Sequence, residues 1–272
     1  MQAPDALRHA AARLSGKSET PRLDAELLLA CALGMDRGEL LVKFHDLAVP
    51  DAFAGLVERR AAGEPVAYIT GMRDFWTISL HVTPDVLIPR PDTETLLEAA
   101  VEYFGKAGPR RILDLGTGSG ALLLAALDEW RDATGLGVDS SDAALTIAHG
   151  NAERLGMENR ARFRLGDWGA GIEERFDLIL INPPYISTQA MLPRDVVGHE
   201  PHAALFAGSD GLDDYRRIAP QLPGLLEKNG MAAVEIGFDQ GQAASALFAA
   251  AKLVVHVRPD LAGRDRCLLI TA

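Results

Sequence analysis

From Arg110 to the end of the chain, short apolar runs alternate with longer segments whose apolar residues recur at helical spacing. Short aliphatic runs bounded by glycine and polar residues are typical of buried strands. Strands joined by helices form a mostly parallel sheet with helices on both faces, so we expect an α/β fold. Two final apolar stretches, Leu253–Arg258 and Cys267–Thr271, predict an antiparallel C-terminal hairpin. The expected strands are 111–115, 135–138, 162–165, 176–181 and 231–235, and the expected helices are 119–130, 141–155, 211–228 and 240–251.

The first third of the chain has a different pattern. Residues 1–65 carry leucine and alanine at helical spacing, with Asp36 and Asp51 as candidate helix caps, and predict a small helical domain suited to docking a partner. Strand composition begins at Val66–Thr70, and Trp76 opens an alternating apolar series. We therefore expect three parts: a helical domain at 1–65, a β-hairpin linker at 66–90 and the α/β domain at 91–272.

The most distinctive local feature follows the strand predicted at 176–181. Asn182-Pro183-Pro184-Tyr185 comes directly after it, and the two prolines end the strand because neither can donate to a ladder. Open α/β sheets bind their ligands at the carboxyl ends of their strands. An amide, a carbonyl of fixed direction and an aromatic ring at that edge suit a flat substrate that carries an NH2 group.

A second ligand-binding pattern follows the strand at 111–115. In Asp114-Leu-Gly116-Thr117-Gly118-Ser119-Gly120-Ala121, the glycines permit a tight turn and close approach of a ligand. Asp139, nineteen residues past Gly120, ends the next strand, where a carboxylate can hold both hydroxyls of a ribose. The same run satisfies the dinucleotide fingerprint, so from this segment alone a nucleotide-dependent dehydrogenase stays open.

A third strand end carries Asp167-Trp168. Here a carboxylate can accept a hydrogen bond from an adenine amino group, and an indole can cover the ring. Together with the glycine loop and Asp139, this pair indicates that three successive strand ends hold one nucleoside.

Composition limits the partners and the compartment. The net charge of −11 and the lack of a long basic run argue against a nucleic-acid-binding protein. No apolar run is long enough to span a bilayer, and Met1–Asp5 does not begin a signal peptide. Cys31 and Cys267 lack CxxC spacing, which favours a reducing compartment, the cytoplasm. We expect a monomer with neither nucleic acid nor membrane as a direct partner.

Taken together, these motifs resemble class I S-adenosylmethionine-dependent methyltransferases that methylate amino groups. The closer resemblance is to the peptide chain release factor glutamine N5-methyltransferases, and it covers essentially the whole chain. Asn-Pro-Pro-Tyr is shared with DNA adenine and RNA guanine methyltransferases, so it indicates the reaction type rather than the substrate. The further stretches that match are Gly63–Gly71, Phe75, Val86–Pro91, Thr93-Glu94, Glu200-Pro201, Ala204-Leu205, Asp210–Leu212, Tyr215–Ile218 and Asp260–Asp265.

The resemblance implies a set of residue roles. Gly116–Gly120, Asp139, Asp167, Trp168 and Asn182 would hold S-adenosylmethionine, and Asn182–Tyr185 would hold the glutamine of the Gly-Gly-Gln motif of release factors. Asn182, Pro183 and Tyr185 would be catalytic. The Asn182 side-chain oxygen and the Pro183 carbonyl would accept the two amide hydrogens, and Tyr185 would stack on the amide plane. Arg90, between two prolines, is a further candidate for substrate binding.

Three alternative functions remain at this stage. A ribosomal-protein glutamine methyltransferase is the nearest, a nucleic-acid amino (adenine N6) methyltransferase comes next, and a non-enzymatic cofactor-binding adaptor is the third. His199-Glu-Pro-His202 suggests a metal site, but Pro201 lies inside it and a third ligand is not apparent, so we expect no metal.

Overall fold

The computed structural model describes residues 2–44, 47–191 and 198–272. The chain divides into two compact units: residues up to Met72 with Gly198 and His199 form the first, and residues 73–191 with 200–272 form the second. The three-part division expected from the sequence, with boundaries at 65 and 90, remains a prediction. Within the described residues, no helix is both long and apolar enough to cross a membrane.

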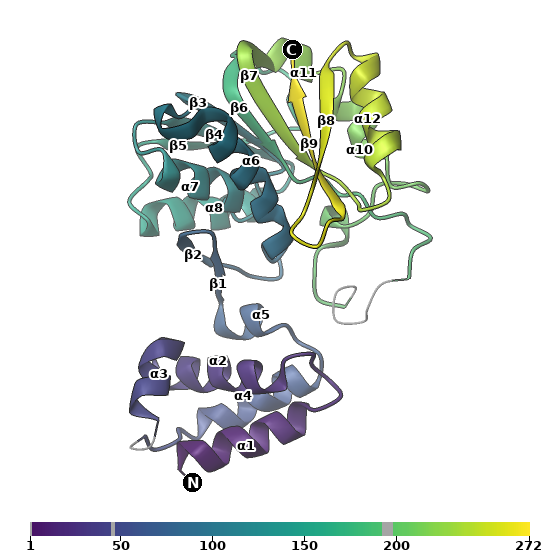
Figure 1. The fold of residues 1–272 in the computed structure, drawn as a ribbon. Coiled ribbons are helices and arrows are strands. Elements are labelled where there is room, and N and C mark those ends of the chain that lie inside the picture. The colour runs from purple at the N-terminus through teal and green to yellow at the C-terminus, as the bar shows by residue number, and fades with distance from the viewer. Residues whose placement is uncertain (1, 45–46, 192–197) are drawn as a thin grey trace. The chain divides into compact units, whose positions relative to one another are not determined.

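The first unit is helical, as its sequence pattern predicted (Figure 1). Its core is made of leucine and alanine side chains, including Leu7, Leu28 and Leu29. Asp36 caps its helix by accepting a hydrogen bond from the Glu39 backbone N–H at 2.8 Å. The helices are α1 (Ala3–Leu14), α2 (Pro21–Leu33), α3 (Arg37–Lys43), α4 (Ala52–Ala61) and α5 (Val66–Thr70).

The strand expected at Val66–Thr70 is wrong. These residues form helix α5, although their side chains favour strands. Pro65 starts the turn, and its carbonyl accepts from the N–H groups of Tyr68 and Ile69. Gly71, with a φ of 73°, ends it in the left-handed conformation. The hairpin therefore starts later than expected, with β1 (Met72–Phe75) and β2 (Ile78–His81). Its turn lies at Trp76 and Thr77.

The second unit contains a seven-stranded sheet with the order β5-β4-β3-β6-β7-β9-β8. β3, β4, β5, β6 and β7 are mutually parallel, and β9 is antiparallel to both of its neighbours, which confirms the predicted C-terminal hairpin. The strands are β3 (Arg111–Leu115), β4 (Thr134–Asp139), β5 (Ala161–Leu165), β6 (Phe176–Ile181), β7 (Leu226–Glu235), β8 (Val254–Pro259) and β9 (Asp265–Thr271).

Helices cover both faces of this sheet (Figure 1). Alternate strand residues such as Leu113, Ile179 and Ile181 pack against Tyr215 and Phe248 of the α10 and α12 helices. The other face packs against α6, α7 and α8. The elements are η1 (Pro91–Thr93), α6 (Glu94–Phe104), η2 (Gly105–Ala107), α7 (Ala121–Glu129), α8 (Asp142–Arg154), η3 (His202–Ala204), α10 (Asp213–Ile218), α11 (Leu222–Leu225) and α12 (Gly241–Ala250).

The single helix predicted over 211–228 is wrong. The structure has two short helices there, α10 and α11, and β7 already begins at Leu226. Pro220 and Pro223 explain the difference, because a proline has no backbone N–H to continue a helix.

Candidate active site

The register of the sheet brings the predicted motifs to one edge. Leu115 at the end of β3 pairs with Val138 of β4 on one side and with Ile181 of β6 on the other. The residues that follow these three strands, Gly116, Asp139 and Asn182, are therefore neighbours in space. Asp139 in turn pairs with Leu165 of β5, so Asp167 and Trp168 leave the sheet at the same edge. This is the carboxyl edge, at which open α/β sheets bind their ligands.

The glycine loop turns sharply, and its N–H groups donate hydrogen bonds to oxygen atoms of the protein. Gly116, Gly118 and Gly120 have φ values of 77°, 55° and 83°, which favour glycine. The N–H groups of Gly116 and Thr117 donate to the Val138 carbonyl, and that of Gly120 donates to the Thr117 carbonyl. The Gly118 N–H donates to Asp139 Oδ2 at 2.8 Å. These donors are thus committed to protein groups rather than to an anionic ligand.

Asp114, at the start of the loop, is buried, with 1% of the residue exposed. Its Oδ2 accepts from the Thr117 hydroxyl at 2.6 Å and from the Leu123 N–H at 3.3 Å. Its Oδ1 has no hydrogen-bond partner among the described residues. Burial raises the pKa of Asp114 from 3.8 to about 7, against the hydrogen bond from Thr117. The residue lines the pocket described below, so a ligand that brings a donor or a positive charge would stabilise its ionised form.

Trp168 has a backbone conformation that residues other than glycine rarely adopt. Its φ is 50°, in the left-handed region. Two contacts fix it: its indole N–H donates to Asp214 Oδ1 at 3.2 Å, and its ring lies so close to Gly116 that a Cβ there would come within 3.2 Å of it. Burial raises the pKa of Asp214, while the hydrogen bond from Arg217 acts in the opposite direction. Strained residues held in this way are concentrated at ligand sites.

Asp167 does not stand alone at its strand end. Both of its carboxylate oxygens lie 2.5 Å from Nη2 of Arg217. The other terminal nitrogen of the guanidinium, Nη1, lies 3.1 Å from Asp214 Oδ1. Arg217 and Asp214 are pocket residues that sequence reasoning missed, because neither belongs to a motif at a strand end.

The Asn182–Tyr185 segment forms hydrogen bonds with the polar side chains of three other residues. The Asn182 side-chain amide donates to Thr93 Oγ1 at 3.2 Å. The Tyr185 hydroxyl donates to Glu235 Oε1 at 3.0 Å, and the Tyr185 carbonyl accepts from Gln240 at 2.9 Å. Burial raises the pKa of the Tyr185 hydroxyl above its usual range, and the nearby charge of Glu235 adds to this effect. These hydrogen bonds connect the segment to Thr93, to the end of β7 and to the residue that precedes α12.

Arg90 forms an ion pair beside the pocket. Its guanidinium lies 2.5 Å from Glu200 Oε1, and Glu200 is buried. The pair joins the segment that contains Val86, Leu87 and Pro89 to the segment that contains Pro201 and Ala203, and these residues line the pocket from that side. Arg90 itself is not among the lining residues.

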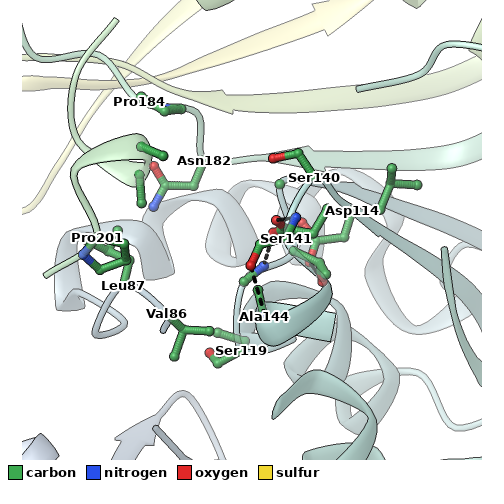
Figure 2. Close-up of a pocket in the computed structure, with 18 of the residues that line it drawn as sticks. Val86, Leu87, Asp114, Ser119, Ser140, Ser141, Ala144, Asn182, Pro184 and Pro201 are labelled. Atoms are coloured by element: carbon green, nitrogen blue, oxygen red, sulfur yellow. Dashed lines mark hydrogen bonds between the residues drawn. The ribbon is translucent and has the colours of Figure 1, made fainter. Parts of the chain in front are cut away.

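These groups surround one cavity of about 600 Å³, a size typical of small-molecule sites. In Figure 2, Asn182 lies between Pro201 on one side and Asp114 on the other. Of the predicted site residues, Gly120, Pro183, Tyr185 and Arg90 lie outside the lining. The predicted residues that do line it are Gly116, Thr117, Gly118, Ser119, Asp139, Asp167, Trp168, Asn182 and Pro184.

The charge of the lining is negative. Asp85, Asp114, Asp139, Asp167 and Asp214 contribute carboxyl groups, and Arg217 is the basic residue among the lining residues. This excess of carboxyl groups over basic groups favours a cationic ligand over an anionic one.

The histidines near the site form no cluster with metal-binding geometry. His202 packs edge-to-face on Phe206, with ring centroids 5.7 Å apart. Within residues 2–44, 47–191 and 198–272, no group of three or more His, Cys, Asp or Glu side chains is arranged to hold a metal ion.

Comparison with known proteins places this chain in a family. Residues 5–71 match the PrmC N-terminal domain, and residues 92–199 match the methyltransferase small domain. Among solved structures, a methyltransferase from Pyrococcus furiosus is similar with a TM-score of 0.52 at 17% identity, over 70% of this chain and 86% of the other. The T. thermophilus 16S rRNA N2 G1207 methyltransferase (RsmC), solved with AdoMet and guanosine, has a TM-score of 0.53 at 20% identity, over 74% and 50%. At these identities, the similarity shows the fold alone, which is the class I methyltransferase fold.

Relatives of known name are much more similar in sequence. A release factor glutamine methyltransferase of Cereibacter sphaeroides is 46% identical over 98% of this chain and 97% of its own. One from Moorella thermoacetica is 44% identical over 97% and 96%, and one from Rhodospirillum rubrum is 44% identical over 92% and 79%. The chain belongs to the release factor glutamine methyltransferase family.

Proposed function

We propose that this enzyme transfers the methyl group of S-adenosylmethionine to the side-chain amide nitrogen, N5, of the glutamine in the Gly-Gly-Gln motif of peptide chain release factors. The observation that carries the proposal is the placement of Asn182 and Pro184 in the wall of an acidic pocket at the carboxyl edge of the sheet. Family membership supports the substrate, because the relatives are named for this reaction.

The pocket chemistry supports a cationic cofactor rather than a dinucleotide. A pyrophosphate is bound by free N–H groups at a helix N-terminus. Here the loop N–H groups of Gly116, Thr117, Gly118 and Gly120 already donate to protein oxygens. A sulfonium cofactor suits the five carboxyl groups of the lining, and the open Oδ1 of Asp114 gives it a buried acceptor. The dehydrogenase that the glycine motif left open is therefore disfavoured.

Several residues would hold S-adenosylmethionine. We assign the ribose hydroxyls to Asp139, the adenine ring to Trp168 and the amino-acid end to the loop Gly116–Gly120. Asp167 and Asn182 complete the set as lining residues. When bound, the cofactor supplies an electrophilic methyl group on a positively charged sulfur.

The protein has to orient a weak nucleophile toward that methyl group. The lone pair of an amide nitrogen is delocalised into its carbonyl, which keeps the group planar. We assign the two N–H bonds of the target glutamine to the Asn182 side-chain oxygen and the Pro183 carbonyl. These acceptors direct the nitrogen and stabilise the positive charge that develops on it. In this mechanism the proton leaves after transfer, so no strong base is required.

Tyr185 and Arg90 have supporting roles in this proposal. The Tyr185 ring would stack on the amide plane, with its hydroxyl fixed by Glu235. Arg90 would act on the substrate side through its ion pair with Glu200, which fixes two segments of the pocket wall.

The test is methyl transfer from labelled S-adenosylmethionine to purified release factor. Parallel reactions contain the factor with its Gly-Gly-Gln glutamine replaced, a ribosomal protein and duplex DNA. We expect label on the intact factor, with none on the replaced one. Label on the ribosomal protein or on DNA, with none on the factor, would overturn the proposed substrate.

A further inference from the structure

Two buried polar side chains, Thr93 and Glu235, contact the Asn182–Tyr185 segment, and the proposed mechanism gives no role to Thr93, which also lines the pocket. Thr93 stands at the end of η1 and is 3% exposed, and Glu235 at the end of β7 is 1% exposed. Thr93 Oγ1 accepts from the Asn182 side-chain NH2 at 3.2 Å, while Glu235 Oε1 accepts from the Tyr185 hydroxyl at 3.0 Å. These two residues thus contact the two side chains that bracket the Asn-Pro-Pro-Tyr segment.

The direction of these hydrogen bonds is set by chemistry. A threonine hydroxyl has one proton to donate and lone pairs to accept, whereas an ionised carboxylate can only accept. Glu235 Oε2 has no hydrogen-bond partner of ordinary geometry in the described part of the chain. Burial raises the pKa of this carboxyl, whereas hydrogen bonds from the Thr93 and Tyr185 hydroxyls and the charge of Arg266 lower it and favour the ionised form. The Thr93 proton is therefore directed toward Glu235, which leaves Oγ1 to accept from Asn182.

We propose that Thr93, oriented by Glu235, is a positioning residue that fixes which end of the Asn182 amide faces the substrate. Because the NH2 group is held by Thr93, the oxygen Oδ1 is the atom left to contact a ligand in the pocket. A reversed amide would present two hydrogens to the N–H bonds of the target glutamine. The inference rests on the proposed function, since it gives Asn182 Oδ1 the role of acceptor.

The orientation also sets specificity. With Oδ1 outward, a glutamate side chain would bring one carboxylate oxygen against another acceptor, and a site that lacks the correct partner rejects an analogue strongly. With the NH2 group outward, Asn182 would donate to a glutamate oxygen, and the Pro183 carbonyl alone would oppose the carboxylate. Thr93 therefore determines discrimination as well as rate.

The experiment compares the wild-type enzyme with Thr93→Val, which keeps the shape and removes the hydroxyl, and with Thr93→Ser, which keeps the hydroxyl. Thr77→Val is the matched control, because its hydroxyl donates to Asp128 at an exposed position outside the pocket. The measurements are kcat and KM on release factor, the Kd of S-adenosylmethionine, and inhibition by a factor that carries glutamate in place of the target glutamine. Thermal melting checks that each variant folds.

We expect kcat of Thr93→Val to fall by about 10- to 100-fold, the scale for a misplaced catalytic group. Its Kd for S-adenosylmethionine should stay within about twofold of the wild-type value, and the glutamate factor should inhibit it more strongly. Thr93→Ser and Thr77→Val should remain close to wild type. A Thr93→Val enzyme with wild-type kcat, or a Thr93→Ser enzyme as slow as the valine variant, would overturn the inference.

Glu235→Gln provides an independent test if Thr93→Val does not fold. Its NH2 group can donate to Thr93 Oγ1 and turn the hydroxyl proton toward Asn182, so we expect kcat to fall and glutamate discrimination to weaken. Unchanged kcat and discrimination would contradict the proposal. If the wild-type enzyme fails to methylate the factor, both the proposed function and this inference are overturned. If the wild-type enzyme is active and the Thr93 and Glu235 variants have the same kcat and the same discrimination against glutamate, the inference alone is overturned.

Discussion

At the scale of single residues, the site is built from polar groups whose environment fixes their state. Among the described residues, one oxygen of the buried Asp114 carboxyl has no partner, and the Asn182 side chain makes a hydrogen bond through its NH2 group to Thr93 and none through its oxygen. Buried polar groups with unused capacity are costly for folding, and they are kept where a ligand supplies the missing partner. The residue-scale predictions follow from these two side chains.

Asn182→Ala removes the proposed side-chain acceptor. We expect kcat for methyl transfer to fall by about 10²–10³, the scale for loss of one preorganised hydrogen-bonding group. Gln189→Ala, at an exposed position a few residues further along the same segment, is the control and should keep wild-type turnover. Near-normal kcat for Asn182→Ala under single-turnover conditions would remove the residue from the mechanism.

Asp114→Asn tests the raised pKa of the buried carboxyl. In the folded protein this pKa is about 7, against 3.8 for an unperturbed group. Its contribution to stability is therefore fully present below about pH 4 and is lost as pH rises through about 7, because the unfolded chain ionises first. Relative to Asp114→Asn, the wild type should lose at most about 4 kcal/mol of unfolding free energy over that range. Urea denaturation of both proteins between about pH 4 and pH 7 measures this loss. If the unfolding free energies of the two proteins change equally with pH, the raised pKa of Asp114 is contradicted.

At the scale of elements, function follows from strand register. The paired ends of β3, β4 and β6 bring three motifs together, and the loop after β5 adds Trp168 against Gly116. The close approach requires that Gly116 have no side chain.

Gly116→Ala should disturb this contact. The new Cβ would lie 3.2 Å from the Trp168 ring at a φ of 77°, and a left-handed alanine costs about 1–2 kcal/mol. We expect lower stability and about tenfold weaker S-adenosylmethionine binding, measured by calorimetry. Gly150→Ala is the matched control: Gly150 lies within α8, and a Cβ there meets nothing within 4 Å. It should leave cofactor binding unchanged and stabilise the helix by up to about 1 kcal/mol.

Local patterns predicted the elements better than the supporting side chains. The strand pattern predicted β3 and β6 at their observed bounds, because buried parallel strands are continuous apolar runs. Thr93, Glu235 and Asp214 were missed as site residues. Thr93 lies 89 positions from Asn182, and Glu235 lies 50 from Tyr185, so no local spacing reveals either contact. Helix α5 was missed because Pro65 and Gly71 outweigh the strand propensity between them.

At the scale of the whole molecule, the two units have separate cores. The core of the first unit is formed by side chains between Ala3 and Ile69. The core around Leu113 and Ile179 lies entirely within the second unit. Each unit therefore has the apolar core that independent folding requires. The resemblance found in the sequence extended over both units, and the family match over 98% of the chain agrees with it.

A chain that begins at Gly71 tests the docking role expected for the helical unit. We expect it to bind S-adenosylmethionine with a Kd within about threefold of the full chain, because the pocket lining lies in the second unit. Its kcat/KM on release factor should fall by about 100-fold, equivalent to about 2.7 kcal/mol of lost binding. The control is the full chain under the same conditions. Equal kcat/KM values would show that the helical unit does not dock the substrate.

In the proposed mechanism, the Asn182–Tyr185 segment presents a glutamine amide nitrogen for methylation. Mass spectrometry of release factor digested after reaction with the wild-type enzyme and with Asn182→Ala tests it most directly. We expect the wild-type enzyme to add the mass of one methylene to the Gly-Gly-Gln peptide, located by fragmentation to the glutamine side chain, and the variant to add little. A methylated residue elsewhere in the factor, or equal modification by both enzymes, would contradict it.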